Sequence, residues 1–304
     1  MKYNQVYGDR STGTGFWLED SLFELGKVDM YHKDIIDSYI NQVSIDLQRI
    51  SVLDYIKDYV TMDVGTGRQA IAIHRLGAKA VNHFDISEAN IQRFNSYIKK
   101  NDISIKSKLA DICDENFNDK KLFDFIYLQG IIQHVRDPYL AIKNLSFASK
   151  NNTKIWFYNY QAGHLVHLYS DAFRKILSKN INFDTLITQL KNKNFSTKSI
   201  DGIIDDCGCT YRHLIANDVY KKALEKFGFN RFFTKDVEIQ DKGLDLKTKR
   251  AACISGFIKS KKYDEKNKIT SKDFIHLDHF NPDNFFALAR LYILYIFLSA
   301  SGNK

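Results

Sequence analysis

The chain has 304 residues, of which 44% are hydrophobic and 26% charged, and its formal net charge is +8 at pH 7. This is the composition of ordinary globular material, and the length suits one domain of about 200 to 250 residues with elaborations, or two small domains. The moderate positive charge favours solubility over a specific anionic partner. Only two prolines occur, Pro138 and Pro282, which excludes a proline-rich linker.

The N-terminal sequence and the cysteine count predict the compartment. The first ten residues, MKYNQVYGDR, lack the apolar core of a signal peptide. Four cysteines without an export signal argue against a disulfide scaffold. We therefore expect a cytoplasmic protein.

The first predicted element is a long amphipathic helix. From about Lys33 to Lys57, apolar residues recur at helical spacing, and they include Ile36, Ile40, Val43, Leu47 and Ile50. Such a helix is expected to cover the edge of a sheet just before its first strand.

A strand, a tight turn and a helix are predicted at 59–77. The apolar strand ends at Gly65, and helical periodicity begins about three residues later. Gly65 and Gly67 let the backbone turn sharply and leave room for a ligand, to which the following helix presents its free N–H groups. Turns of this kind bind nucleotide-like cofactors.

The turn alone leaves the cofactor open. Read from Gly65 it has the pattern G-x-G-x-x-A, and Asp85 lies 20 residues further on, as in a dinucleotide fingerprint. However, Asp63 precedes the first glycine by two residues, and an acid there repels a pyrophosphate but suits the positive amino-acid end of S-adenosylmethionine. The pattern acid-x-G-x-G resembles the first motif of the class I S-adenosylmethionine-dependent methyltransferases. Gln69 stands where that family often has a third glycine.

Further apolar runs predict strands that alternate with helices. The expected strands are 79–86, 105–112, 123–129 and 153–160, with helices at 88–100 and 138–145. This alternation implies a doubly wound, mostly parallel sheet, in which ligands bind at the carboxyl ends of the strands. Four candidate residues fall at such ends, and they are Gly65, Asp85, Asp111 and Gln129.

The resemblance implies a role for each strand end. Asp63 would contact the ammonium group of the cofactor, Asp85 both ribose hydroxyls, and Asp111 the adenine amino group. The full set of cofactor residues that it implies is Asp63, Gly65, Thr66, Gly67, Asp85, Ile86, Asp111, Ile112 and Gln129. No metal is expected, because methyl transfer does not require one.

A second specific signal follows the fourth strand, at 130–138. It resembles a segment of the ubiquinone-biosynthesis-like and related small-molecule branches of the family, where a glutamate-histidine pair is common, and Gln133 replaces the glutamate. The resemblance puts His134 near the methyl group, where the near-neutral unperturbed pKa of histidine suits a general base. A histidine that only orients the loop is an equal alternative.

The alternation breaks down at about 161–215, where members of this family commonly carry a substrate lid. Small-molecule members often also fold the N-terminal segment over the site. The substrate residues implied are Tyr7, Arg10, Tyr160, Tyr211 and His213. A metal cluster of Cys207, Cys209 and His213 is disfavoured, because the second ligand pair of a zinc site is missing.

Two more strands are predicted at 232–239 and 251–258, joined by a basic polar loop. They resemble the antiparallel final pair that distinguishes the methyltransferase sheet from a dinucleotide-binding one. The basic stretch from Lys242 to Lys268 could touch phosphate, although a solvated loop is the favoured interpretation.

The most apolar run of the chain lies at 285–298. It contains Arg290 and has only about 14 residues, too few for a membrane span. Packing on the domain is favoured, with a homodimer interface through this C-terminal helix as the next alternative.

Together these patterns predict an α/β fold with a doubly wound, mostly parallel seven-stranded sheet and an antiparallel last strand. The expected parts are an N-terminal segment and covering helix at 1–58, a methyltransferase core at 59–260 with an inserted helical lid at about 161–215, and a C-terminal helical extension at 261–304.

The expected function is methyl transfer from S-adenosylmethionine to an oxygen, nitrogen, sulfur or carbon atom of a small molecule. An RNA methyltransferase is the chief alternative, and nucleic acid is disfavoured because the fourth strand does not end in the N/D-P-P-Y/F pattern used for exocyclic base nitrogens. A nicotinamide enzyme or a non-catalytic cofactor-binding protein ranks lower.

Overall fold

A computed structural model describes residues 30–117, 122–159, 183–195, 211–239, 248–259 and 263–274. Its strands are β1 (Val60–Val64), β2 (Ala80–Asp85), β3 (Lys106–Leu109), β4 (Phe123–Gln129), β5 (Ser149–Tyr158), β6 (Phe229–Asn230), β7 (Phe233–Ile239) and β8 (Thr248–Lys259). Its α-helices are α2 (Lys33–Arg49), α3 (Arg68–Arg75), α4 (Glu88–Lys100), α5 (Pro138–Ala148), α7 (Phe183–Asn192) and α9 (Asn217–Lys226). Short 3-10 turns lie at Leu53–Asp58, Ile132–His134 and Ser271–Asp273.

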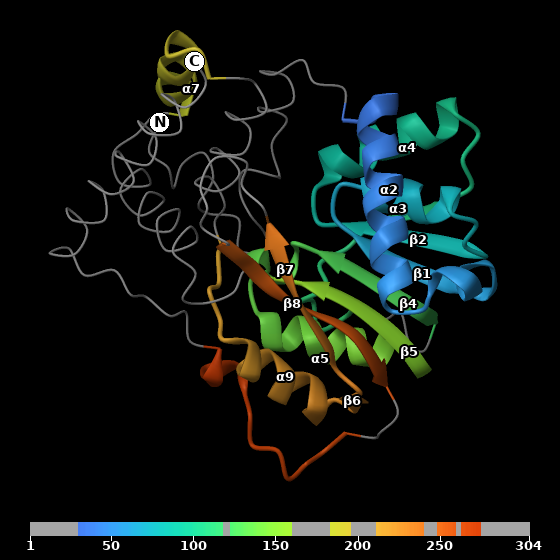
Figure 1. Ribbon diagram of the computed structural model, residues 1–304, viewed down its shortest axis with the longest axis vertical. Helices are drawn as coiled ribbons and strands as arrows, with labels where there is room; N and C mark the ends of the chain where they lie inside the picture. Colours follow the sequence, from blue (N-terminus) through green and yellow to red (C-terminus); the bar gives the residue numbers. More distant parts are fainter. Residues whose placement is uncertain are drawn as a thin grey trace, which may run out of the picture.

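The strands form one sheet in the order β3-β2-β1-β4-β5-β8-β6, and β7 also pairs with β8. The pairs from β3 to β5 are all parallel, which confirms the expected α/β fold with a parallel sheet. β8 runs antiparallel to β5, β6 and β7. Figure 1 shows α2, α3 and α4 on one face of the sheet and α5 and α9 on the other.

The predicted number of seven strands is wrong for the described residues, which form eight. The predicted strand at 232–239 begins as β7, but Phe229–Asn230 forms the separate strand β6 just before it. Arg231 between them has φ +57°, in the left-handed region that breaks an extended strand. β8 has 12 residues and is therefore long enough to pair with both pieces.

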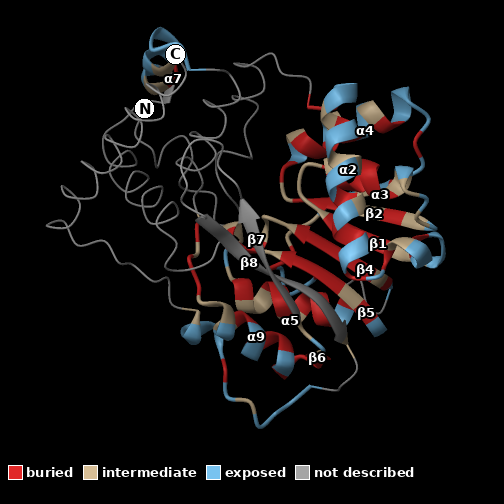
Figure 2. Ribbon diagram, in the orientation of Figure 1, coloured by how far each residue is buried: buried red, intermediate tan, exposed pale blue. Residues whose placement is uncertain are grey.

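Residues along the central strands alternate between two cores. The side chains that pack with α5 and α9 include Met62, Ile126, Leu128, Ile155 and Phe157. Those that pack with α2, α3 and α4 include Val81, Phe125, Tyr127 and Trp156. Both faces of the sheet are therefore covered, as a doubly wound fold requires. In Figure 2 the central strands are mostly buried, whereas the helices expose their outer sides.

The first helix is shorter than predicted. α2 ends at Arg49, because Ser51 adopts a left-handed conformation with φ +52°, and a 3-10 turn follows. Its buried positions, Ile36, Val43 and Leu47, pack with α3 and not on the edge of the sheet.

Asp46 on α2 makes the stability of the fold depend on pH. It is buried and accepts a hydrogen bond from Tyr127 Oη at 2.9 Å, and burial raises its pKa from 3.8 to about 6. Because the folded state binds this proton more tightly, the contribution to stability is complete below about pH 4 and is lost as the pH rises through 6. Between pH 4 and pH 8 the wild type is expected to lose roughly 2 to 3 kcal/mol more of its free energy of unfolding than an Asp46→Asn variant. Urea unfolding of both proteins at the two pH values measures this difference, and an identical pH dependence would contradict it.

In the parts of the chain that the structure describes, no helix has the length and apolar character needed to cross a membrane. The apolar run at 285–298 lies outside these residues.

Candidate active site at the carboxyl edge of the sheet

The parallel strand order gathers the predicted cofactor residues at one edge of the sheet. β1 lies between β2 and β4, so the chain order of the strands reverses at β1. In an open α/β sheet, ligands usually bind in the crevice outside the carboxyl ends of the strands at such a point. Backbone hydrogen bonds tie the loops of this edge together, from Gly65 N to Phe84 O and from Ala110 N to Asp85 O, both 2.9 Å long.

The turn after β1 needs glycine at two positions. Gly65 and Gly67 have φ of +123° and +84°. A Cβ atom on Gly67 would lie 2.4 Å from the ring of Phe94, and one on Gly65 would lie 2.9 Å from Ile131 in the loop after β4. α3 begins directly after Gly67, so its first N–H groups remain available at the turn. A side chain at Gly65 would therefore strain the backbone and clash with Ile131 even without a bound cofactor.

Thr66 and Ile86 lie half-buried at the same edge. The backbone oxygen of Thr66 accepts a hydrogen bond from Tyr31 Oη at 2.9 Å, and its side-chain oxygen accepts one from Arg68 Nε at 3.0 Å. The turn is thereby fixed to the segment that precedes α2.

Asp63 is a buried acid whose carboxylate accepts no hydrogen bond from the described residues. Its register partners are His83 on β2 and Tyr127 on β4. Nδ1 of His83 lies 3.4 Å from Oδ2 of Asp63, and both side chains are almost fully buried. Among the described residues neither carboxylate oxygen has a hydrogen-bond partner. Two orphaned oxygens beside the glycine turn fit a cationic group such as an ammonium.

Asp85 both ends β2 and fixes the start of α4. Its Oδ1 accepts a hydrogen bond from Ser87 N at 2.7 Å, and its Oδ2 accepts one from Asn90 Nδ2 at 3.2 Å. Ser87 caps α4 by accepting a hydrogen bond from Asn90 N. Burial raises the pKa of Asp85 to about 6. Since a carboxylate has about four acceptor sites, Asp85 can still accept from hydroxyl groups.

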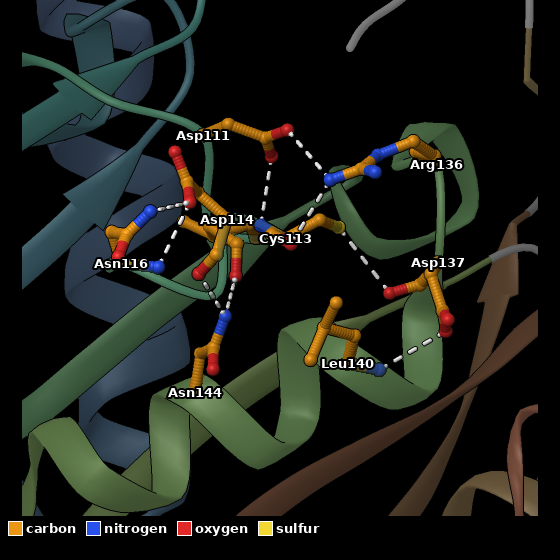
Figure 3. A network of polar contacts seen from close by, with 9 residues as sticks. Asp111, Cys113, Asp114, Asn116, Arg136, Asp137, Leu140 and Asn144 are labelled. Carbon is orange, nitrogen blue, oxygen red and sulfur yellow. Dashed lines mark hydrogen bonds and ion pairs between the residues drawn. The ribbon is translucent and has the colours of Figure 1, made fainter. Parts of the chain in front are cut away.

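Asp111 belongs to a polar network that joins the loop after β3 to the loop after β4 (Figure 3). Its Oδ1 accepts from Cys113 N at 2.7 Å, and its Oδ2 lies 3.5 Å from Arg136 Nη2. Arg136 also donates to Cys113 O, and Asn144 on α5 donates to the backbone oxygens of Ile112 and Asp114. Burial raises the pKa of Asp111.

The side-chain oxygen of Gln129, at the end of β4, is already in use. It accepts a hydrogen bond from Trp156 Nε1 at 2.8 Å and lies 3.4 Å from Tyr127 Oη, whose one hydrogen is donated to Asp46. The amide N–H groups of Gln129 can donate to a ligand.

The segment 211–213 is bound to the loop after β4 by three hydrogen bonds. His213 N donates to Gln133 O and its Nε2 contacts Val135 O, both at 2.8 Å, while His134 Nδ1 lies 3.0 Å from Tyr211 O. A carbonyl oxygen only accepts, so Nδ1 of His134 carries the hydrogen and, in the neutral ring, Nε2 carries the lone pair. The rings of Tyr211 and His213 stack with centroids 6.1 Å apart. The structure thus brings together three predicted residues, whereas Tyr7, Arg10 and Tyr160 lie outside the described residues.

Two polar residues of this edge were not predicted as site residues. His83 is identified by its register with Asp63 on the neighbouring strand. Its position two residues before Asp85 already places it on the same face of the strand as that acid. Gln133 is fully buried, and among the described residues neither polar atom of its side chain has a partner. Its Nε2 lies 3.5 Å from where a Cβ atom on Gly130 would stand.

A buried acid with free oxygens in front of the glycine turn suits a cofactor with a cationic end, and not a pyrophosphate. The fold and this edge thus define the class I S-adenosylmethionine-dependent methyltransferases, whose cofactor is S-adenosylmethionine. Residues 62–157, less than half of the chain, match the family model described as "Methyltransferase domain".

Individual proteins are similar over parts of the chain. The ubiquinone biosynthesis O-methyltransferase of Pelagibacter ubique is 28% identical over 161 residues, which are 49% of this chain and 66% of that protein, slightly less than two thirds of its length. A solved S-adenosylmethionine-dependent methyltransferase of Methanosarcina mazei is 15% identical, with 66% of this chain and 91% of that chain covered and a TM-score of 0.43. A chain from the complex that contains the Haloferax volcanii Trm112 methyltransferase activator is also 15% identical, with 80% and 99% covered and a TM-score of 0.47.

Asp85→Asn tests the expected contact with the ribose. The variant keeps an acceptor for Ser87 N but loses the charge, so the affinity for S-adenosylhomocysteine is expected to fall by about 1.5 to 3 kcal/mol, the range for hydrogen bonds to a charged group. Calorimetry with S-adenosylhomocysteine and its 2′-deoxy analogue measures the effect. If the variant still preferred the ribose form as strongly as the wild type, the contact would be wrong.

Proposed function

We propose that the protein transfers a methyl group from S-adenosylmethionine to a small-molecule acceptor, with His134 as the general base. The observation that carries this proposal is the hydrogen bond from His134 Nδ1 to Tyr211 O, because it makes Nε2 the basic nitrogen of the neutral ring. When bound, S-adenosylmethionine supplies an electrophilic methyl group on its sulfonium centre.

We propose that each strand end binds a different part of the cofactor. Asp63 would hold the ammonium group and Asp85 the ribose hydroxyls. Asp111 would accept a hydrogen bond from the adenine amino group and keep its contact with Arg136. The lining would be completed by Gly65, Thr66, Gly67, Ile86, Ile112 and Gln129. In this arrangement the cofactor occupies the edge from β3 to β4, and the acceptor would approach from the side of β4 and β5.

The acceptor is proposed to be a hydroxyl group. His134 Nε2 would take the hydroxyl proton as the oxygen forms its bond to the methyl carbon and the carbon–sulfur bond breaks, so the ring would end the step as an imidazolium. The similar Pelagibacter protein, an O-methyltransferase by name, supports an oxygen acceptor. The side-chain amide of Gln133 offers both donors and an acceptor oxygen beside His134, which suits a second polar group of the substrate.

A small substrate is favoured by the segments expected to enclose the site. The proposed lid at 161–215 ends in Tyr211 and His213, which are bound to the loop of His134. Together with the N-terminal segment, which holds Tyr7 and Arg10, such a lid would exclude folded RNA. We also propose the three parts expected from the sequence, which are the N-terminal segment and covering helix at 1–58, the methyltransferase core at 59–260 and the C-terminal extension at 261–304. A dimer through the C-terminal helix is proposed as well.

The test is to follow labelled methyl groups from S-adenosylmethionine into a metabolite extract and, separately, into bulk tRNA and rRNA. Label in a small molecule, lost in a His134→Asn variant, is the expected result. Label in RNA alone would contradict the proposal and favour the RNA enzyme.

A further inference from the structure

The side-chain amide of Gln129 is held in one orientation at the carboxyl edge of the sheet. Its oxygen accepts a hydrogen bond from Trp156 Nε1 at 2.8 Å. Because an indole N–H can only donate, the oxygen of the amide and not its nitrogen must face the indole. The amide N–H₂ group therefore points away from Trp156, and it makes no hydrogen bond to another described residue. Gln129 is half-buried, so this group can meet a ligand.

The core fixes the direction of the indole N–H of Trp156. Trp156 is 3% exposed on β5 and is the register partner of Tyr127 on β4. The two rings lie nearly parallel, at 7°, with centroids 6.1 Å apart. Tyr127 in turn donates its hydroxyl hydrogen to Asp46 on α2 at 2.9 Å. Since a packed core leaves such an indole little freedom to turn, it also sets the orientation of the Gln129 amide.

Gln129 projects from the same face of the sheet as Asp63. Asp63 on β1 is the register partner of Tyr127, and Gln129 follows Tyr127 by two residues on β4. Because side chains alternate along a strand, all three lie on one face, with Gln129 nearest to the carboxyl edge. An acid whose oxygens accept no hydrogen bond from the described residues and an N–H₂ donor thus stand on neighbouring strands beside the glycine turn. They match the ammonium and carboxylate groups that an amino acid carries on one carbon atom.

The cation at the start of α3 is engaged elsewhere. Arg68 Nε donates to Thr66 Oγ1 at 3.0 Å, and its guanidinium lies over the ring of Tyr39 on α2, 4.7 Å from the centroid. Besides the first N–H groups of α3, the amide of Gln129 therefore remains available as a donor at this edge.

We propose that the amide N–H₂ of Gln129 binds the carboxylate at the amino-acid end of the cofactor, and that Trp156 is the positioning residue that keeps the amide turned toward it. The inference rests on the proposed function, with the ammonium group at Asp63. Without the indole N–H, the amide could rotate and present its oxygen, which would repel the carboxylate. Trp156 thus acts through Gln129 and does not itself touch the cofactor.

The affinities for two ligands test the role of Gln129. S-adenosylhomocysteine and its decarboxylated analogue, which keeps the ammonium group but lacks the carboxylate, are titrated into the full chain by calorimetry. The wild type should bind S-adenosylhomocysteine at least about tenfold more tightly, the effect of a hydrogen bond to a charged group. In Gln129→Met, whose side chain has nearly the same length and no N–H, this preference should fall by about tenfold, while the analogue binds as before.

A double-mutant cycle tests the role of Trp156. Trp156→Phe should lower the preference by about two- to tenfold in the wild-type background, the range for a neutral hydrogen bond. In the Gln129→Met background it should have no further effect on the preference. A residue that only supported the fold would instead weaken the binding of both ligands, and it would do so in either background.

Phe125→Leu is the matched control for the loss of packing. Phe125 is a fully buried aromatic residue of the same core and lies on β4, like Gln129. Its side chain has no polar group that could orient the amide. The variant should lower stability, as large-to-small core substitutions do, and leave the preference for the carboxylate unchanged.

The hydrogen bond can also be observed without any ligand. The chain has two tryptophans, Trp17 and Trp156, so the ¹⁵N-labelled indole signal that remains in Trp17→Phe belongs to Trp156. In Gln129→Met this signal should shift, and its hydrogen should exchange faster with solvent. The measurement does not depend on whether Trp156→Phe folds.

The same preference in the wild type and in Gln129→Met, or an additive effect of Trp156→Phe in the double variant, would overturn the inference while leaving the cofactor site intact. An indole signal that Gln129→Met does not change would contradict the positioning role. If the wild type did not bind S-adenosylhomocysteine at all, the proposed function would be wrong, and this inference with it.

Discussion

Asp63→Asn is expected to weaken the binding of S-adenosylhomocysteine by about 100- to 1,000-fold, since it removes the one buried charge that faces the ammonium group (roughly 3 to 4 kcal/mol). The substitution preserves the shape of the side chain and removes a buried charge, so the fold should remain intact. Calorimetry gives the affinity, and circular dichroism confirms the fold.

Asp124→Asn provides the control for this experiment. Asp124 also lies on a central strand, but near the amino end of β4, where it accepts hydrogen bonds from Val60 N and Lys150 Nζ. Its loss should lower stability without changing cofactor affinity. Near-wild-type affinity in Asp63→Asn would show that the carboxylate does not hold the cofactor.

The second large effect is expected from His134. In His134→Asn the amide N–H₂ can still donate to Tyr211 O, but no base remains at the position of Nε2. The rate constant kcat should therefore fall by about 10²- to 10⁴-fold, the usual contribution of a general base, with little change in the affinity for S-adenosylhomocysteine.

Two variants separate the base from an orienting histidine. If His134 only orients the loop, His134→Asn keeps most of the activity and His134→Ala loses it. If His134 is the base, both variants lose activity to a similar extent. Single-turnover rates measured with the acceptor found in the metabolite extract distinguish the two cases.

The carboxyl edge was predictable because its features are local in sequence. Apolar runs of strand length, two glycines after the first and acids after the next two predict both the parallel sheet and the place of Asp63, Asp85 and Asp111. The cap of α4 by Ser87 is equally local, since capping depends on residues within one turn.

Features that depend on a single backbone conformation or on a distant partner were missed. The early end of α2 and the split of β6 from β7 follow from left-handed conformations at Ser51 and Arg231, which are not glycines and give no signal in the sequence. The ion pair of Asp111 with Arg136 and the contact of Asp63 with His83 join residues 20 or more positions apart, and only the strand register brings them together. The predictions for Tyr7, Arg10, Tyr160 and the apolar run at 285–298 stay predictions.

The most direct measurement for the central claim is a side-by-side titration of the full chain with S-adenosylhomocysteine and NADH in the same calorimeter. A methyltransferase site with an unsatisfied acid before the glycine turn should bind S-adenosylhomocysteine with one site per chain and should not bind NADH, whose pyrophosphate would meet Asp63. Binding of NADH without binding of S-adenosylhomocysteine would contradict the cofactor and the function together.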